Sequence, residues 1–92
     1  MKLIFTKTSL LKLEDIKKYI TKDSAIKAEN LIIKIKNSIL LLQKNPLIGV
    51  IGRLENTREF YIPSTNYFIV YKITKNELYI VNIIHTSTNY GS

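Results

Sequence analysis

Three short apolar segments near the end of the chain, residues 60–62, 67–73 and 78–84, restrict what the sequence can fold into. They are rich in β-branched and aromatic residues, and the four-residue connections 63–66 and 74–77 have the composition of turns. This pattern predicts an antiparallel meander of three strands.

Helical periodicity precedes the meander. Leucine and isoleucine recur at spacings of three and four over residues 10–20, and alanine, leucine and isoleucine do so over 28–42, which places apolar side chains on one face of each of two helices. Asn45-Pro46 ends the second helix, because proline disfavours the helical conformation in the residue before it. Four residues are candidates for capping a helix through a side-chain oxygen: Thr8 or Ser9 for the first helix, and Asp23 or Ser24 for the second.

The order of these elements predicts the fold class. A strand candidate at residues 2–6 precedes the helices, and residues 47–56 form a connection with two glycines. We therefore expect one α+β domain over residues 1–92, with an antiparallel helical hairpin packed on one face of a mostly antiparallel four-stranded sheet. Since the strands are apolar on both faces and the helices cover one, we expect the second face to be bare and to bind a partner.

Composition excludes several classes of site. With no cysteine and one histidine, a disulfide or thiolate metal site is impossible and a zinc site is disfavoured, so we expect no metal and no cofactor. The apolar runs are far shorter than the ~20 residues that span a bilayer, and no secretory signal is evident. We expect a cytoplasmic protein without a membrane partner.

The charge is strongly positive and uneven. The whole chain carries +7, and residues 1–45 hold ten lysines against four acidic residues, whereas residues 46–92 hold four basic residues against three acidic ones. Such an excess favours a polyanionic partner, either nucleic acid or an acidic protein. The alternative is a solvated lysine face without a binding role.

A series of short motifs follows the helical hairpin: Asn45-Pro46, Ile48-Gly49, Gly52-Arg53, Thr57-Arg58-Glu59-Phe60, Tyr67-Phe68-Ile69-Val70-Tyr71, and Ile83-Ile84-His85 followed by Tyr90. In the order and spacing of these residues the chain resembles the RelE/ParE superfamily of toxins from bacterial type II toxin–antitoxin modules. The resemblance implies a compact α+β toxin that a cognate antitoxin inhibits by wrapping around it.

The resemblance leaves the target open. RelE-like members cleave mRNA on the ribosome, and ParE-like members poison DNA gyrase. The presence of both His85 and Tyr90 favours a ribonuclease, whereas the few basic residues in 46–92 suit a gyrase inhibitor. A third hypothesis is a basic, non-catalytic module that binds RNA or an acidic peptide.

Five residues are candidates for metal-free RNA cleavage. His85 is suited to proton transfer near neutral pH, and Glu59 is the other candidate base. Arg53 and Arg58 are candidates for binding the phosphate through their guanidinium forks, and Tyr90 for stacking on a base or orienting the phosphate. By resemblance, Arg58, His85 and Tyr90 match positions near the RNA-cleaving site of the family.

Each candidate also has a structural interpretation. A lone histidine at a strand end is often held by hydrogen bonds, and Arg58 and Glu59 can form ion pairs with neighbouring elements. Tyr90, close to the last residue of the sequence, can simply cover the sheet. Geometry has to decide between these interpretations.

Overall fold

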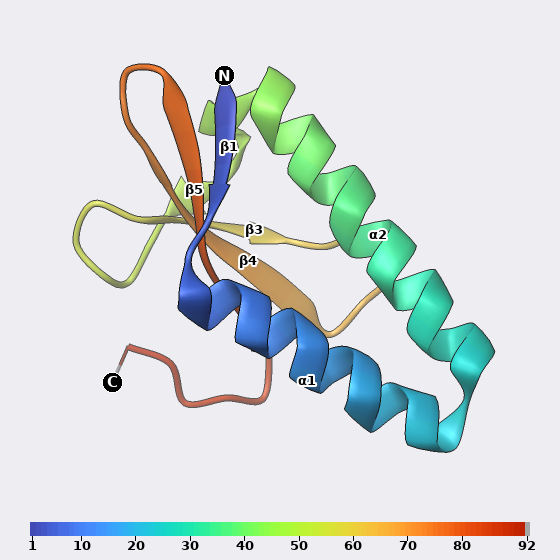
Figure 1. Ribbon diagram of the computed structural model, residues 1–92. Coiled ribbons are helices and arrows are strands. Elements are labelled where there is room, and N and C mark those ends of the chain that lie inside the picture. Colours follow the sequence, from blue (N-terminus) through green and yellow to red (C-terminus); the bar gives the residue numbers. More distant parts are fainter. Residues whose placement is uncertain (92) are drawn as a thin grey trace.

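The computed structural model describes residues 1–91 and has two layers, a five-stranded sheet and a pair of helices on one face of it (Figure 1). Along the chain the elements are β1 (Lys2–Phe5), α1 (Lys7–Asp23), α2 (Ala25–Lys44), a 3-10 helix η1 (Pro46–Ile48), β2 (Val50–Ile51), β3 (Arg58–Tyr61), β4 (Tyr67–Ile73) and β5 (Glu77–His85). The predicted α+β architecture is confirmed. No helix within residues 1–91 has the length and apolar character needed to cross a membrane.

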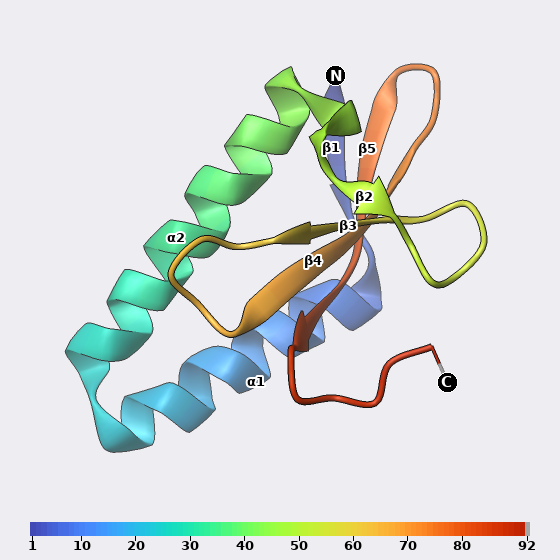
Figure 2. The same cartoon turned by 180° about the vertical axis from the view of Figure 1, so that it is seen from behind.

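The sheet has one more strand than the sequence predicted. Its strands lie in the order β1-β5-β4-β3-β2, in which β1 runs parallel to β5 and the other pairings are antiparallel. The additional strand, β2, forms the edge of the sheet beside β3 and lies within the connection 47–56 (Figure 2). A strand of two residues is too short to show periodicity, so no pattern predicts it.

Two of the three predicted helix borders agree with the structure. Ser24 caps α2 by accepting a hydrogen bond from the amide of Lys27, and its own amide bonds to the last turn of α1. Helix α2 ends before Pro46 as expected. The N-cap of α1 is Thr6 rather than Thr8 or Ser9, because Thr6 also bonds to the carbonyls of β5 and thereby stops the strand.

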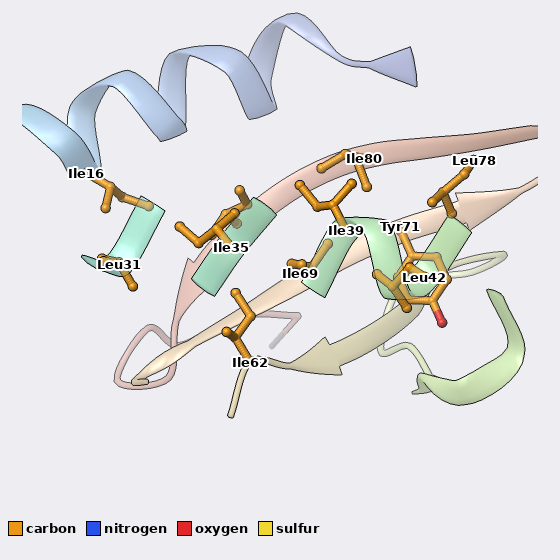
Figure 3. Packing of buried hydrophobic residues seen from close by; sticks show 11 residues of the cluster. Ile16, Leu31, Ile35, Ile39, Leu42, Ile62, Ile69, Tyr71, Leu78 and Ile80 are labelled. Carbon is orange, nitrogen blue, oxygen red and sulfur yellow. The ribbon is translucent and has the colours of Figure 1, made fainter. Parts of the chain in front are cut away.

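The face of the sheet toward the helices is an aliphatic core. Leu42, Ile69, Leu78 and Ile80 are completely buried, and Ile35 is 1% exposed. Figure 3 shows these side chains meeting between α2 and the strands. Burial of each such side chain contributes about 1.5–3 kcal/mol relative to exposure.

The second face of the sheet is not bare, and this prediction was wrong. Phe68, Val70 and Ile84 on this face are 1%, 0% and 5% exposed. The turn between β2 and β3 and the C-terminal tail both extend on the side away from α2 in Figures 1 and 2. Tyr90 of the tail packs against this cluster and contacts the Phe68 ring, so the chain covers this face itself.

Candidate functional site

The turn between β2 and β3 positions Arg53 over the second face of the sheet. The amide of Gly52 donates to the carbonyl of Thr57 at 2.8 Å, and Thr57 Oγ1 donates to the carbonyl of Leu54 at 2.6 Å. A side chain on Gly52 would collide with Thr57. This close approach of backbone and side chain explains the glycine that precedes Arg53.

Arg53 and Glu59 form a bidentate ion pair. Arg53 Nη2 lies 3.0 Å from Glu59 Oε1, Nε lies 3.3 Å from both carboxylate oxygens, and the Arg53 amide donates to Oε2 at 2.9 Å. The Glu59 side chain is 3% exposed and the Arg53 side chain 42% exposed. A half-exposed guanidinium therefore closes over a buried carboxylate.

Three tyrosine and phenylalanine rings complete what we call the Arg53 cluster, which consists of Arg53, Glu59, Tyr61, Phe68 and Tyr90. Arg53 Cζ lies 5.0 Å from the Phe68 ring centroid and 5.2 Å from that of Tyr90. Nη2 also donates to the Tyr61 hydroxyl at 3.1 Å, and Nη1 to the Tyr90 carbonyl at 3.2 Å. The cation thus fixes the tail against the sheet.

The electrostatics of the Arg53 cluster favour a structural role. Burial by itself raises the pKa of the Glu59 carboxyl, but the hydrogen bonds and charge of Arg53 outweigh it, and the resulting pKa is below the ordinary value. The hydrogen bond to Glu59 raises the pKa of Arg53. Glu59 is therefore a weak proton acceptor, and the donors of Arg53 are engaged within the chain.

Arg58 lies apart from this cluster, on the opposite side of β3, where strand alternation turns it away from Glu59. Its Nη1 donates to the carbonyls of Gly49 at 2.7 Å and Leu47 at 3.3 Å. Arg58 therefore anchors the segment between α2 and β2 to the sheet.

His85 ends β5 beside α1. Its ring meets Tyr67 edge-on at 5.1 Å, and its Nδ1 accepts a hydrogen bond from the amide of Ser87 at 3.1 Å. Because the amide donates to Nδ1, the proton of the neutral imidazole is assigned to Nε2. His85 lines a shallow groove of about 220 Å³ together with Lys12 and Tyr19 of α1.

The structure distributes the predicted site residues over three places. Arg53, Glu59 and Tyr90 lie together, but Arg58 pairs with Tyr71 and His85 with Tyr67, four residues apart on β4. At about 3.3 Å per residue, this separates them by roughly 13 Å along the strand. The family resemblance placed Arg58 and His85 near one site, whereas in this sheet they lie near opposite ends of β4.

The sequence reasoning also missed the residues beside His85. Lys12, Asp15, Ile16 and Tyr19 share one face of α1 at helical spacing, which was a usable signal. Their position next to His85 depends on how α1 docks on the sheet, and periodicity does not show this. Within residues 1–91, no three histidine, aspartate or glutamate side chains lie close enough together to hold a metal ion.

Comparison with known proteins decides the family. A family model described as the ParE toxin of the type II toxin–antitoxin system parDE matches residues 3–90. The chain belongs to this toxin family. A relative of this ParE-family toxin, the candidate toxin Y4kP of Sinorhizobium fredii, is 30% identical over 81 residues, which span 88% of this chain and 83% of that protein.

Solved structures share the fold of this ParE-family toxin. A chain of the chromosomal ParDE system from P. aeruginosa matches with a TM-score of 0.81 at 19% identity, covering 92% of this chain and 95% of that one. A chain of the intact E. coli RelBE toxin–antitoxin complex matches with a TM-score of 0.66 at 13% identity, covering 95% and 98%. The isolated E. coli RelE toxin gives 0.66 at 14% identity, covering 97% and 87%. The predicted membership of the RelE/ParE superfamily is thereby confirmed.

Several residues that carried the family resemblance hold the β2 region in place. A side chain on Gly49 would collide with the Tyr71 hydroxyl, which accepts a hydrogen bond from the Gly49 amide at 2.9 Å and donates to the Pro46 carbonyl at 2.7 Å. Arg58 bonds to the same segment. In this ParE-family toxin, much of the motif serves the packing of one loop.

Proposed function

We propose that this ParE-family toxin arrests growth by binding DNA gyrase, rather than by cutting RNA, and that a cognate antitoxin neutralises it. The observation that carries this proposal is the dispersal of the five predicted site residues. Metal-free cleavage needs a proton acceptor, a phosphate-binding cation and a proton donor around one phosphodiester, each within hydrogen-bond reach of about 3 Å. Here Arg58 and His85 are separated by roughly 13 Å along β4, and Arg53 is bound to Glu59.

Cleavage of mRNA on the ribosome is the competing mechanism, and it depends on His85. This histidine is half-buried beside a groove with Lys12 and keeps Nε2 available, since Ser87 engages only Nδ1. His85 and Lys12 supply one imidazole and one ammonium group. Cleavage needs three groups, a proton acceptor, a phosphate-binding cation and a proton donor, so this groove alone lacks one of them.

The antitoxin is expected to be acidic and to bind the helical half of the molecule. Residues 1–45 carry most of the positive charge, and a groove of about 250 Å³ between α2 and β3 has Leu41, Phe60 and Pro63 in its lining and Lys34 at its edge. An amphipathic segment with carboxylates beside its apolar side chains would match both features.

Growth arrest distinguishes the two mechanisms. Expression from a tightly controlled promoter, followed by pulse-labelling, should show early loss of DNA synthesis, and the purified toxin should inhibit supercoiling by gyrase. Early loss of protein synthesis with cut mRNA would instead support the ribonuclease. Harmless expression of a folded wild-type chain would leave the basic, non-catalytic binding module as the explanation.

Substitution of His85 tests the same choice at one residue. We expect His85→Ala and His85→Asn to remain as toxic as the wild type, because gyrase binding does not require an imidazole. His85→Asn is the matched control for folding, since its amide oxygen can still accept the hydrogen bond from Ser87. Loss of toxicity in both variants, with unchanged thermal unfolding, would overturn the proposed mechanism.

A further inference from the structure

The groove beside His85 is one of three hollows that join near the turn of the helical hairpin. The first has a volume of about 220 Å³, the second about 490 Å³ and the third about 470 Å³. The first and second share Tyr67, the first and third share Tyr19, and the second and third share Ile20 and Asp23. We call the connected surface the hairpin trough.

Two charged side chains of the first hollow, those of Lys12 and Asp15, have no partner among residues 1–91. Lys12 is half-buried, yet among residues 1–91 neither Lys12 nor Asp15 makes a hydrogen bond or an ion pair. His85 uses Nδ1 for Ser87 and leaves Nε2 as a donor. The Lys12 ammonium group therefore has no acceptor within residues 1–91, and a ligand with an acceptor atom would give it one.

Aromatic rings line the same hollow. Tyr19 is 75% exposed, and Tyr67 stands edge-on to His85. Burial raises the pKa of Tyr67, and the proximity of Tyr19 raises it further, which fits the two rings lying on one hollow. Exposed rings next to a cation are the arrangement on which nucleobases stack in single-strand-binding proteins.

Two further lysines continue the positive charge along the trough. Lys27 and Lys34 line the second hollow together with Asn30 and Asn66. Lys27 pairs with Asp23 at 3.5 Å, but both side chains are more than 70% exposed, so this pair holds the lysine weakly. Lys34 makes one long hydrogen bond to the Ser64 carbonyl, at 3.4 Å. Phosphate oxygens would be stronger partners for both.

We propose that the hairpin trough binds single-stranded nucleic acid, with one nucleotide in the groove beside His85 and the adjacent phosphates on Lys27 and Lys34. A hollow of about 220 Å³ is smaller than the roughly 300–1,000 Å³ of sites for drug-sized ligands and suits a single base. Lys12 and His85 provide donors for a phosphate or a base edge, and Asp15 provides an acceptor for an amino group of the base. The exposed ring of Tyr19 favours a nucleic acid over an acidic peptide, because a base can stack on it.

This inference goes beyond the proposed function, because it assigns to the toxin a direct contact with nucleic acid. A fluorescein-labelled oligoadenylate, prepared as DNA and as RNA, would be titrated with the purified chain at low salt while anisotropy is measured. Binding of either strand, with an affinity that falls as salt rises, is expected. The stronger of the two arms identifies whether the natural ligand is DNA or RNA.

Variants locate the binding. Tyr19→Ala should weaken it about tenfold through loss of base stacking, and Lys12→Gln or Lys34→Gln should each lower the log-log salt slope by about one unit. The matched controls are Lys17→Gln on α1 and Lys36→Gln on α2, which remove the same charge outside the trough. Thermal unfolding of each variant verifies that it is folded.

Three results would overturn the inference. They are absence of binding to both strands at low salt, equal losses in the trough variants and their controls, and equal competition by a duplex of the same sequence. Inhibition of gyrase by the wild type does not depend on these measurements, so the trough can fail as a binding site while the proposed function stands.

Discussion

The two faces of the sheet are both buried, but by different means. The face toward the helices is closed by aliphatic side chains from α1 and α2 that interlock with the strands. The opposite face is closed by the Arg53–Glu59 pair and by Tyr90 of the tail. The face closed by the ion pair therefore depends on charge and on pH, whereas the stability of the helix-covered face depends on how well its side chains fill the core. The following predictions test this contrast.

The largest effect is expected on the helix-covered face. Leu42→Ala should lower the free energy of unfolding by about 2–5 kcal/mol, because Leu42 is completely buried and its truncation leaves a cavity. Leu40→Ala, on the same helix but 56% exposed, is the matched control and should change it by less than about 0.5 kcal/mol. Urea unfolding measures both, and similar losses would contradict the assigned packing of α2.

On the opposite face, Arg53→Met should destabilise the chain by less than Leu42→Ala does. It leaves the buried Glu59 carboxylate without a cation, and this is more harmful than removing both charges. The double variant Arg53→Met, Glu59→Gln should therefore recover part of the loss in a double-mutant cycle. If the double variant is the sum of its single variants, the two residues do not act as a pair.

Acid should weaken the same pair without any substitution. The pKa of Glu59 is lower in the folded chain than its ordinary value of about 4.3. Its contribution to stability is therefore present above pH ~4.3 and is lost as the pH falls through the lower folded pKa. Glu59→Gln should flatten the pH dependence of urea unfolding in this range, while Glu55→Gln, at an exposed position, should leave it unchanged.

The smallest effect is expected from the tail. Tyr90→Ala removes the edge contact with Phe68, whose ring centroids lie 5.7 Å apart, and should lower the free energy of unfolding by about 0.5–1.5 kcal/mol. Amide exchange in β4 near Phe68 should become faster. Tyr19→Ala, which removes an exposed tyrosine from α1, should not change this exchange rate. Unaltered exchange in Tyr90→Ala would mean that the tail does not protect the sheet.

The contrast between the faces also explains what the sequence could predict. The helix-covered face could be predicted from local patterns. The apolar face of α2, its N-cap Ser24 and its end before Pro46 each depend on residues that are close together in the sequence. The opposite face depends on contacts between Arg53 and residues 6 and 37 positions away, which no local pattern contains. The alternation of side chains along β3 did not show that Arg53 would bind the Glu59 carboxylate. Arg53 reaches it because of the turn around Gly52, which lies outside the strand.

The site was predictable only in part for the same reason. Arg53, Glu59 and Tyr90 were identified as candidates and do lie together, although as a structural cluster. Arg58 and His85 were identified as well, but the register of β4 with its two neighbours places them at opposite ends. Registers of this kind are set by the packing of whole strands, so residue types alone do not reveal them.

The parallel pairing of β1 with β5 has a consequence for how this toxin is made. β1 spans Lys2–Phe5 and its partner β5 spans Glu77–His85, so β1 has no pairing partner until β5 has been synthesised. Contacts between such distant segments form slowly, because a long loop has to close first. A nascent chain interrupted before β5 lacks the strand that lies between β1 and β4, so this sheet cannot form before β5 has been synthesised.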